Sequence, residues 1–145
     1  MDDNHAGNMA NRRSHYGIII HVNNEPIIWY SKLQNTVEAS NHRSESVALR
    51  IATDMIESMR YKLICFGIPV EGPAEVFCDN ISFVKNLSIP KSALNKRHNA
   101  ICYHRVREAH ATGILQVGWI TADFNLSGFL TKTTTTGNTR NNLVD

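Results

Sequence analysis

Residues 16–31 read YGIIIHVNNEPIIWYS, and the fold is built outward from them. Residues 16–22 and 26–31 are two runs of mostly β-branched, apolar and aromatic side chains, which favour strands. Asn23 and Asn24 lie between the runs, and asparagine tolerates the left-handed backbone conformation that a tight hairpin turn requires. The stretch therefore predicts an antiparallel β-hairpin.

A long amphipathic helix is predicted after the hairpin. From Ala48 to Phe66 (ALRIATDMIESMRYKLICF), apolar residues recur at spacings of three and four, which is the period of one helix face. Ser44 is a candidate N-cap and Gly67 a candidate end, because serine and glycine favour these two positions. We therefore expect a helix over about 44–66.

The remaining segments alternate between strand and helix patterns. We expect strands over 74–79 and 114–120, short helices over about 80–87 and 125–131, and a basic helix over about 96–112 that ends at Gly113. A hairpin followed by alternating helices and strands implies an α/β protein with a mixed sheet and helices on its faces. Trp29 and Trp119 are expected to pack in the core.

Composition limits the classes of protein to which the chain can belong. The 145 residues carry 15 Lys and Arg against 13 Asp and Glu, a formal charge of +2, and are 42% hydrophobic, which is ordinary for one globular domain. No apolar run reaches the roughly 18–20 residues of a membrane helix. The three cysteines form no CxxC pair, and the first residues lack a signal-peptide pattern. We therefore expect an intracellular protein with no membrane partner.

Positive charge is concentrated in one segment, 91–107 (KSALNKRHNAICYHRVR). This segment contains no acidic residue and carries the basic residues Lys91, Lys96, Arg97, Arg105 and Arg107. Such a cluster is typical of a surface that binds a polyanion. A solvated helix face is the alternative interpretation, and charge alone does not separate the two.

Five short motifs occur in a characteristic order: 29–37 (WYSKLQNTV), 44–49 (SESVAL), 78–80 (CDN), 96–108 (KRHNAICYHRVRE) and 130–132 (LTK). In this order and spacing the chain resembles the ribonuclease H domain of copia-type retrotransposon polyproteins, which follows the reverse transcriptase. Residues 2–8 and 12–15 also resemble the opening segments of that family.

The resemblance implies a ribonuclease H-like fold, with a mixed five-stranded sheet and helices, over residues 1–132, followed by a polar tail at 133–145. It implies cleavage of the RNA strand of an RNA–DNA hybrid, with Mg²⁺ or Mn²⁺ held by clustered carboxylates. Mg²⁺ prefers oxygen ligands, and two such ions can assist phosphodiester hydrolysis. A reverse transcriptase domain of the same polyprotein is a further expected partner.

By the same resemblance, three of the four family acids fall on Asp2, Glu45 and Asp79, as catalytic residues and metal ligands. The strand that carries Asp2 would need residues before Met1. Lys91, Lys96, Arg97 and Arg105 are the residues expected to contact nucleic-acid phosphates.

The fourth acid is replaced by Gly128, in 125–132 (NLSGFLTK). Asp123 precedes the last helix and is not expected to substitute for it. Cleavage is therefore expected to be impaired, and the alternative is a non-catalytic module of the same fold that binds nucleic acid or packs against reverse transcriptase. A base role for His42 and a zinc site at His98, Cys102 and His104 are weaker alternatives.

Overall fold

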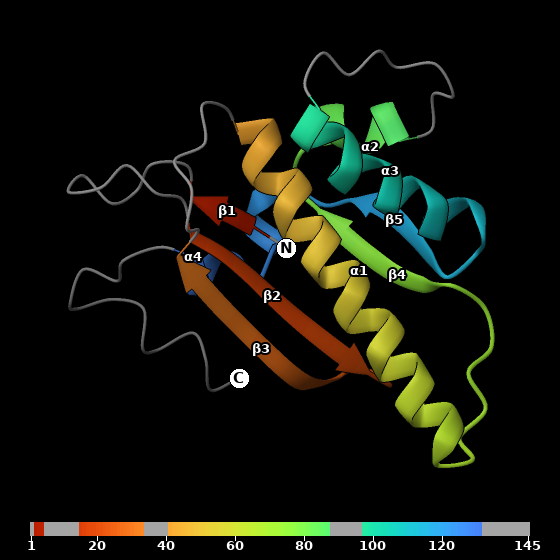
Figure 1. Cartoon of the computed structure of the whole chain (residues 1–145). Helices are drawn as coiled ribbons and strands as arrows, with labels where there is room; N and C mark the ends of the chain where they lie inside the picture. The colour runs from red at the N-terminus through yellow and green to blue at the C-terminus, as the bar shows by residue number, and fades with distance from the viewer. Residues whose placement is uncertain (1, 5–14, 34–40, 88–96, 132–145) are drawn as a thin grey trace, which may run out of the picture.

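The computed structural model describes residues 2–4, 15–33, 41–87 and 97–131, with the backbone alone at 2–4, 41–43 and 97–100. Figure 1 shows the arrangement of the elements. In chain order they are β1 (Asp2–Asn4), β2 (His15–Val22), β3 (Glu25–Leu33), α1 (Asn41–Cys65), β4 (Ala74–Cys78), α2 (Ile81–Leu87), α3 (Arg97–Ala111), β5 (Leu115–Trp119), the 3-10 helix η1 (Ala122–Phe124) and α4 (Gly128–Thr131).

The predicted hairpin is confirmed. β2 and β3 pair antiparallel from His15 opposite Leu33 to Val22 opposite Glu25. Asn23 and Asn24 form the turn with φ angles of 51° and 69°, the left-handed conformation that a two-residue hairpin turn requires.

The long helix is confirmed, but its start is not where the sequence pattern placed it. α1 begins at Asn41, so Ser44 lies inside the helix, where it is fully buried. Its end agrees with the prediction: Gly67 has a φ of +75° and donates to the carbonyl of Ile64, while Ile68 donates to the carbonyl of Leu63. Glycine favours this C-terminal geometry because it adopts positive φ without strain.

Helix α1 packs against both groups of strands. Ala48 and Ala52 lie against Tyr16 and Ile18 of β2. The neighbouring Leu49 belongs to a second core cluster with residues of β4, α2, α3 and β5, among them Val76, Phe83, Val106 and Leu115. Figure 1 shows α1 lying between the hairpin and the β4–β5 pair. One helix therefore links the two halves of the fold.

The four-residue helix α4 lies on the other face of the hairpin. Tyr16 and Ile18 face α1, and successive side chains of a strand point to opposite faces, so Gly17 faces away from α1. A Cβ atom on Gly17 would lie 2.6 Å from the carbonyl oxygen of Ser127 and 2.8 Å from the Cβ of Leu130. The absence of a side chain at position 17 lets α4 approach the sheet this closely.

The mixed α/β class is confirmed, but the single five-stranded sheet is not. Within the described residues, β1, β2 and β3 form an antiparallel sheet, and β4 and β5 form a separate parallel pair. The reason lies in β1, which spans three residues and pairs only with His15–Gly17 of β2. It is too short to join the two sheets along their length.

Both tryptophans were expected in the core, and both expectations are wrong. Trp29 is 67% exposed on β3, and Trp119 is 47% exposed at the end of β5. The core is instead made of aliphatic residues with Tyr16, Phe83 and Tyr103. Among the described residues, none of the helices has the length and apolar character needed to cross a bilayer.

Candidate functional site

Asp79 follows the last residue of β4 and is held by its backbone. The indole Nε1 of Trp119, on the neighbouring strand, donates to the carbonyl oxygen of Asp79 at 3.1 Å. The next residue, Asn80, accepts a hydrogen bond from the backbone N–H of Phe83 at 3.1 Å, which caps α2. A fixed strand end and a capped helix start therefore hold Asp79 at the edge of the parallel pair.

Glu45 lies in the second turn of α1, half-buried, and its Oε2 atom is shielded from solvent. Residues three and four positions apart share one face of a helix. Glu45 therefore lies on the face that carries Ala48, packed on β2, and Leu49, packed on the β4 side. This places its carboxylate where α1 meets both groups of strands.

The buried thiol of Cys78 directly precedes Asp79 in the chain and lies within reach of the charge of Glu45. Burial raises the pKa of the Cys78 thiol from 9.0 to about 11, and the negative charge of Glu45 is the next cause. The backbone N–H of Asn80 opposes the shift, and the charge of Asp79 adds the smallest increase. Two carboxylates from different elements thus act on one buried thiol at the carboxyl end of β4. Two oxygen-donor groups at such a point suit a hard divalent cation such as Mg²⁺.

The backbone of Asp2 lies beside α4. Asp2 stands opposite Gly17 in the register of β1 and β2, and Gly17 packs directly under Ser127 and Leu130. Both α1 and α4 contact β1. Gly128, where the resemblance leads us to expect an acid, is buried as the first residue of α4. The side chain of Asp2 lies outside the described residues, so the described part of the candidate site is Glu45, Asp79 and Gly128.

The alternative acid, Asp123, lies in η1 and is exposed to solvent. It precedes Gly128 by five residues and is separated from α4 by the turn at 125–127. Nothing in its position brings it to Cys78.

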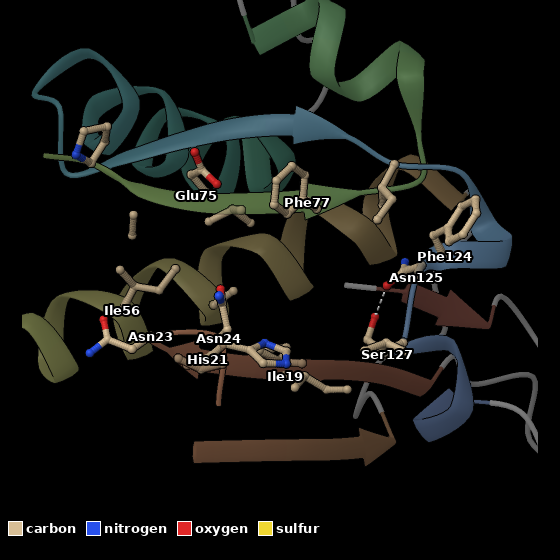
Figure 2. Close-up of a pocket in the computed structure, with 18 residues that line it drawn as sticks. Ile19, His21, Asn23, Asn24, Ile56, Glu75, Phe77, Phe124, Asn125 and Ser127 are labelled. Atoms are coloured by element: carbon tan, nitrogen blue, oxygen red, sulfur yellow. Dashed lines mark hydrogen bonds between the residues drawn. The ribbon is translucent and has the colours of Figure 1, made fainter. Parts of the chain in front are cut away.

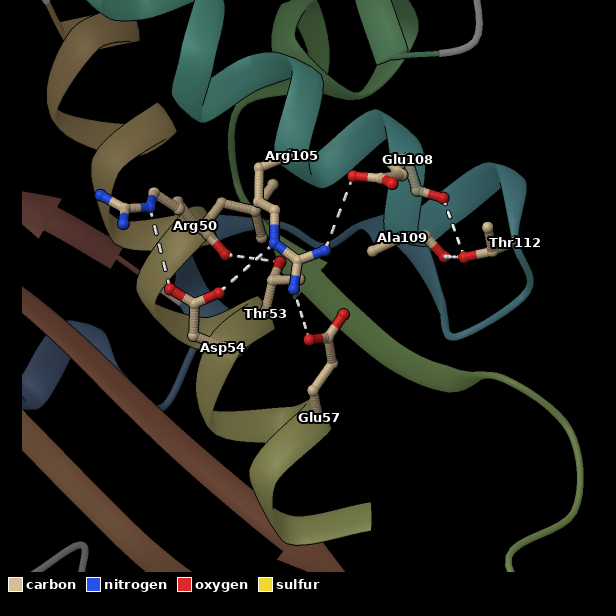
Figure 3. Close-up of polar contacts among 9 residues, drawn as sticks. Arg50, Thr53, Asp54, Glu57, Arg105, Glu108, Ala109 and Thr112 are labelled. Atoms are coloured by element: carbon tan, nitrogen blue, oxygen red, sulfur yellow. Dashed lines mark hydrogen bonds and ion pairs between the residues drawn. The ribbon is translucent and has the colours of Figure 1, made fainter. Parts of the chain in front are cut away.

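Of the basic residues predicted to contact phosphates, Arg105 has a fully described side chain. Its guanidinium Nη2 donates to Oε2 of Glu57, while its Nε lies 3.6 Å from Asp54 and its Nη1 3.8 Å from Glu108 (Figure 3). These carboxylates raise the pKa of Arg105 further above its ordinary value, the hydrogen bond to Glu57 being the largest cause. Arg105 therefore joins α3 to α1, a role that the sequence pattern did not indicate.

Lys91 and Lys96 lie outside the described residues, and Arg97 is described by its backbone, at the first position of α3. Elsewhere on α3, Tyr103 is buried, packs edge-on against Phe83 and donates its hydroxyl to the carbonyl of Asn86. The guanidinium of Arg107 lies 5.6 Å from the centre of the Tyr103 ring. These contacts fix the orientation of α3 relative to α2.

The alternative of a zinc site at His98, Cys102 and His104 gains no support. Among the residues that the structure describes, no group of three or more His, Cys, Asp or Glu side chains could hold a metal ion. Cys102 is buried and His104 is exposed on the same helix. The side chains of His42 and His98 lie outside the described residues.

The curated proteins that match the chain include two from Arabidopsis thaliana. The chain is 27% identical over 131 residues to the Retrovirus-related Pol polyprotein from transposon RE2, and 28% identical over 131 residues to that from transposon RE1. Each match covers 90% of this chain and 9% of the polyprotein, so the chain spans about a tenth of the length of these relatives. No protein-family model matches the chain. The two matches support a chain derived from a region of a retrotransposon polyprotein.

Proposed function

We propose that the chain is the ribonuclease H-like domain of a copia-type retrotransposon polyprotein, acting on the RNA strand of an RNA–DNA hybrid with impaired cleavage. The observation that carries the proposal is the placement of two carboxylates: Glu45 lies on the face of α1 that packs against both groups of strands, and Asp79 is held at the carboxyl end of β4. The relation to retrotransposon Pol polyproteins supports it independently. The order of the motifs in the sequence favours the ribonuclease H domain over the other domains of the polyprotein.

In this proposal, Glu45, Asp79 and Asp2 are the residues that would hold Mg²⁺ or Mn²⁺. The bound ions would supply positive charge at the scissile phosphate and lower the pKa of an attacking water. The protein fixes where the ligands lie: α1 holds Glu45 between the two groups of strands, and the hydrogen bond from Trp119 holds the backbone of Asp79. Carboxylates held in place before metal arrives need little reorganisation to bind it.

The basic residues are proposed to bind the hybrid through its phosphates. Lys91, Lys96 and Arg97 precede or begin α3, whereas Arg105 is already surrounded by the carboxylates of Glu57, Asp54 and Glu108. We therefore assign the main phosphate contacts to Lys91, Lys96 and Arg97, with a smaller contribution from Arg105. Contacts of this kind recognise the backbone and shape of a hybrid rather than its base sequence.

Gly128 is the proposed cause of impaired cleavage. Three carboxylates, instead of four, would offset the mutual repulsion of two divalent ions. The loss falls beside β1, so the ion nearest Asp2 and α4 would be held most weakly. Because Glu45 and Asp79 remain, binding of a first ion would persist.

The non-catalytic alternative has its own supporting observation. Tyr61 and Ile64, near the C-terminal end of α1, and Phe66, just after it, are 70%, 60% and 81% exposed. Exposed large apolar side chains that are close in sequence are consistent with a surface that packs against another domain. Together with Gly128, this surface suits a module that packs against a reverse transcriptase domain without cleaving hybrid.

Metal binding tests the proposal directly. We expect Mn²⁺, titrated into the chain in a calorimeter, to bind the wild type about tenfold or more tightly than it binds Glu45→Gln or Asp79→Asn. Asp123→Asn removes an exposed carboxylate of the same charge and is expected to bind like the wild type. Equal Mn²⁺ affinity in Glu45→Gln, Asp79→Asn and the control would contradict the proposed site.

A further inference from the structure

Trp119 is an accessible aromatic side chain that is fixed in place beside Asp79. Its indole Nε1 donates to the carbonyl oxygen of Asp79 at 3.1 Å, although the residue is 47% exposed. A buried tryptophan needs a protein partner for its N–H, whereas an exposed one can donate to water. The bond to Asp79 therefore holds an open indole next to the candidate metal site instead of satisfying a buried group.

The first residue of α2 extends this apolar surface. Trp119 stands two residues after Val117, which packs on the core cluster of α2 and α3, so both side chains lie on the same face of β5. Ile81 begins α2 two residues after Asp79 and is 44% exposed. Two apolar side chains that solvent can reach therefore lie close to Asp79, one through a hydrogen bond and one along the chain.

Positive charge begins one helix turn further on. Lys85 is exposed and lies four residues after Ile81, and residues four apart share one face of a helix. From Asn80 to Arg107 the sequence contains no acidic residue. An aromatic surface followed by positive charge is the combination that binds single-stranded nucleic acid, because bases stack on the ring and cations pair with the phosphates.

The opposite face of the parallel pair lacks this combination. Phe77 and Phe124 are also exposed aromatic residues, and Figure 2 shows both beside the cavity of about 830 Å³ that lies between β2 and β4. Among the described residues, the lining of this cavity contains Glu75 and no Lys or Arg. A negative charge without a cation repels phosphates. The exposed aromatic residue that suits a polyanion is therefore Trp119, on the α2 side.

A fully paired duplex offers no free base to this indole. Each base of a duplex is covered on both faces by its neighbours, so a fixed aromatic ring stacks on bases outside the paired region. Because Trp119 is bonded to Asp79, a base on its ring would lie next to the candidate metal ligands. A hybrid that continues as a single strand would meet both features at once.

We propose that Trp119, together with Ile81, is a stacking site for an unpaired nucleotide, and that the chain binds junctions between an RNA–DNA hybrid and a single strand more tightly than blunt hybrids. This inference rests on the proposed function for the placement of the hybrid at Glu45 and Asp79. Lys85 contacts a phosphate of the single strand. The site selects no particular base, because every base has a flat face.

Hybrids with and without a single-stranded overhang test the inference. Binding is measured by fluorescence anisotropy in EDTA, which prevents metal-dependent cleavage, with overhangs of both polarities. We expect the wild type to bind an overhang hybrid about fivefold or more tightly than the blunt hybrid. Trp119→Ala should lose this preference. Trp119→Phe should keep most of it, because it keeps an aromatic ring while losing the N–H that donates to Asp79.

Two controls are matched to Trp119. Phe124→Ala removes an exposed aromatic ring on the cavity side, and Trp29→Phe changes the second tryptophan of the chain, on β3. Both variants should keep the wild-type preference. In Trp29→Phe, Trp119 is the single tryptophan, and the overhang hybrid should quench its fluorescence. In Trp119→Phe, the fluorescence of Trp29 should not change when the same hybrid binds.

The outcomes separate this inference from the proposed function. Equal affinity of the wild type for blunt and overhang hybrids would contradict the inference and leave the proposed function standing. Loss of the preference in Trp119→Phe as in Trp119→Ala would also contradict it, because the bond to Asp79 and not the ring would then be responsible. Tight binding of the single strand without binding of the blunt hybrid would support the stacking site and contradict the proposed action on hybrids.

Discussion

The carbonyl oxygen of Ser127 lies 2.6 Å from the point where a Cβ atom on Gly17 would stand. This close approach packs α4, and with it Gly128, against β2, the strand on which Gly17 lies opposite Asp2. We expect Gly17→Ala to push α4 away from β2 and to lower the free energy of unfolding by about 1–3 kcal/mol, the usual cost of overpacking. Urea denaturation measures the change.

Gly118→Ala is the matched control for that substitution. Its nearest neighbours would be ring atoms of Phe77 at 3.2 Å, and this 46% exposed side chain can shift. We expect a cost below about 1 kcal/mol. Equal destabilisation by the two alanine variants would mean that the close approach of α4 to Gly17 has no special role.

The Cys78 thiol gives the fold a dependence on alkaline pH. Its pKa is raised from 9.0 to about 11, chiefly by burial and then by Glu45. The folded state therefore holds the thiol proton more tightly than the unfolded state. Its contribution to stability is full below about pH 9 and is lost as the pH rises toward about 11, in total about 2–3 kcal/mol. Denaturation of wild type and Cys78→Ala across this range isolates the effect, and parallel curves would contradict it.

Glu45→Gln tests whether the carboxylate of Glu45 lies near the thiol of Cys78. Removing the negative charge should lower the pKa of Cys78, so that alkylation of Cys78 by iodoacetamide begins at lower pH. Cys65 is exposed and serves as the internal reference in the same sample. Asp123→Asn should leave the Cys78 profile unchanged, and an unchanged profile in Glu45→Gln would separate Glu45 from the end of β4.

Arg105 is expected to contribute to stability through Glu57. Their side chains are 32% and 30% exposed, so the pair is partly screened by solvent. A double-mutant cycle with Arg105→Ala and Glu57→Ala should give a coupling of about 0.5–1 kcal/mol that weakens at high salt. The more exposed pair of Arg50 and Asp54, 3.8 Å apart, should give a smaller value. An absence of coupling between Arg105 and Glu57 would contradict this stabilising role and leave phosphate binding as the role of Arg105.

Lys96 and Arg97 are expected to bind hybrid through phosphates. The double variant Lys96→Ala/Arg97→Ala should weaken binding to hybrids of different sequence equally. If each residue releases about one counterion, the dependence of log affinity on log salt should fall by about 1.5–2. Lys62→Ala, in the last turn of α1, removes a positive charge elsewhere on the surface and is the control. An unchanged salt dependence, measured by fluorescence anisotropy, would contradict a phosphate role.

Local signals explain which parts of the fold could be predicted. Asn23 and Asn24 form the turn expected of them, and Gly67 and Gly113 end their helices with φ angles of +75° and +74°. Each of these features depends on a few adjacent residues, so the sequence pattern carries it directly.

Features that depend on tertiary contacts could not be predicted. Trp119 looked like a core residue, but it is partly exposed and donates to the backbone of Asp79, forty residues away. Arg105 looked like one of several free basic residues, but Asp54 and Glu57, about fifty residues earlier, meet it across two helices. Glu45 and Asp79 were selected by motif resemblance. That the charge of Glu45 reaches the buried Cys78, next to Asp79, follows from the packing of α1 and could not be seen in spacing.

Gly128→Asp measures the central proposal most directly. Acidic side chains are favoured in the first turn of a helix, and Gly128 is the first residue of α4. With Mg²⁺, we predict that Gly128→Asp cleaves the RNA strand of a hybrid at least about tenfold faster than the wild type, since it restores the missing carboxylate. The neutral variant Gly128→Asn should stay at the wild-type rate, and adding Asp79→Asn should abolish the gain. An unchanged rate in a folded Gly128→Asp chain that still binds Mn²⁺ would contradict the proposal.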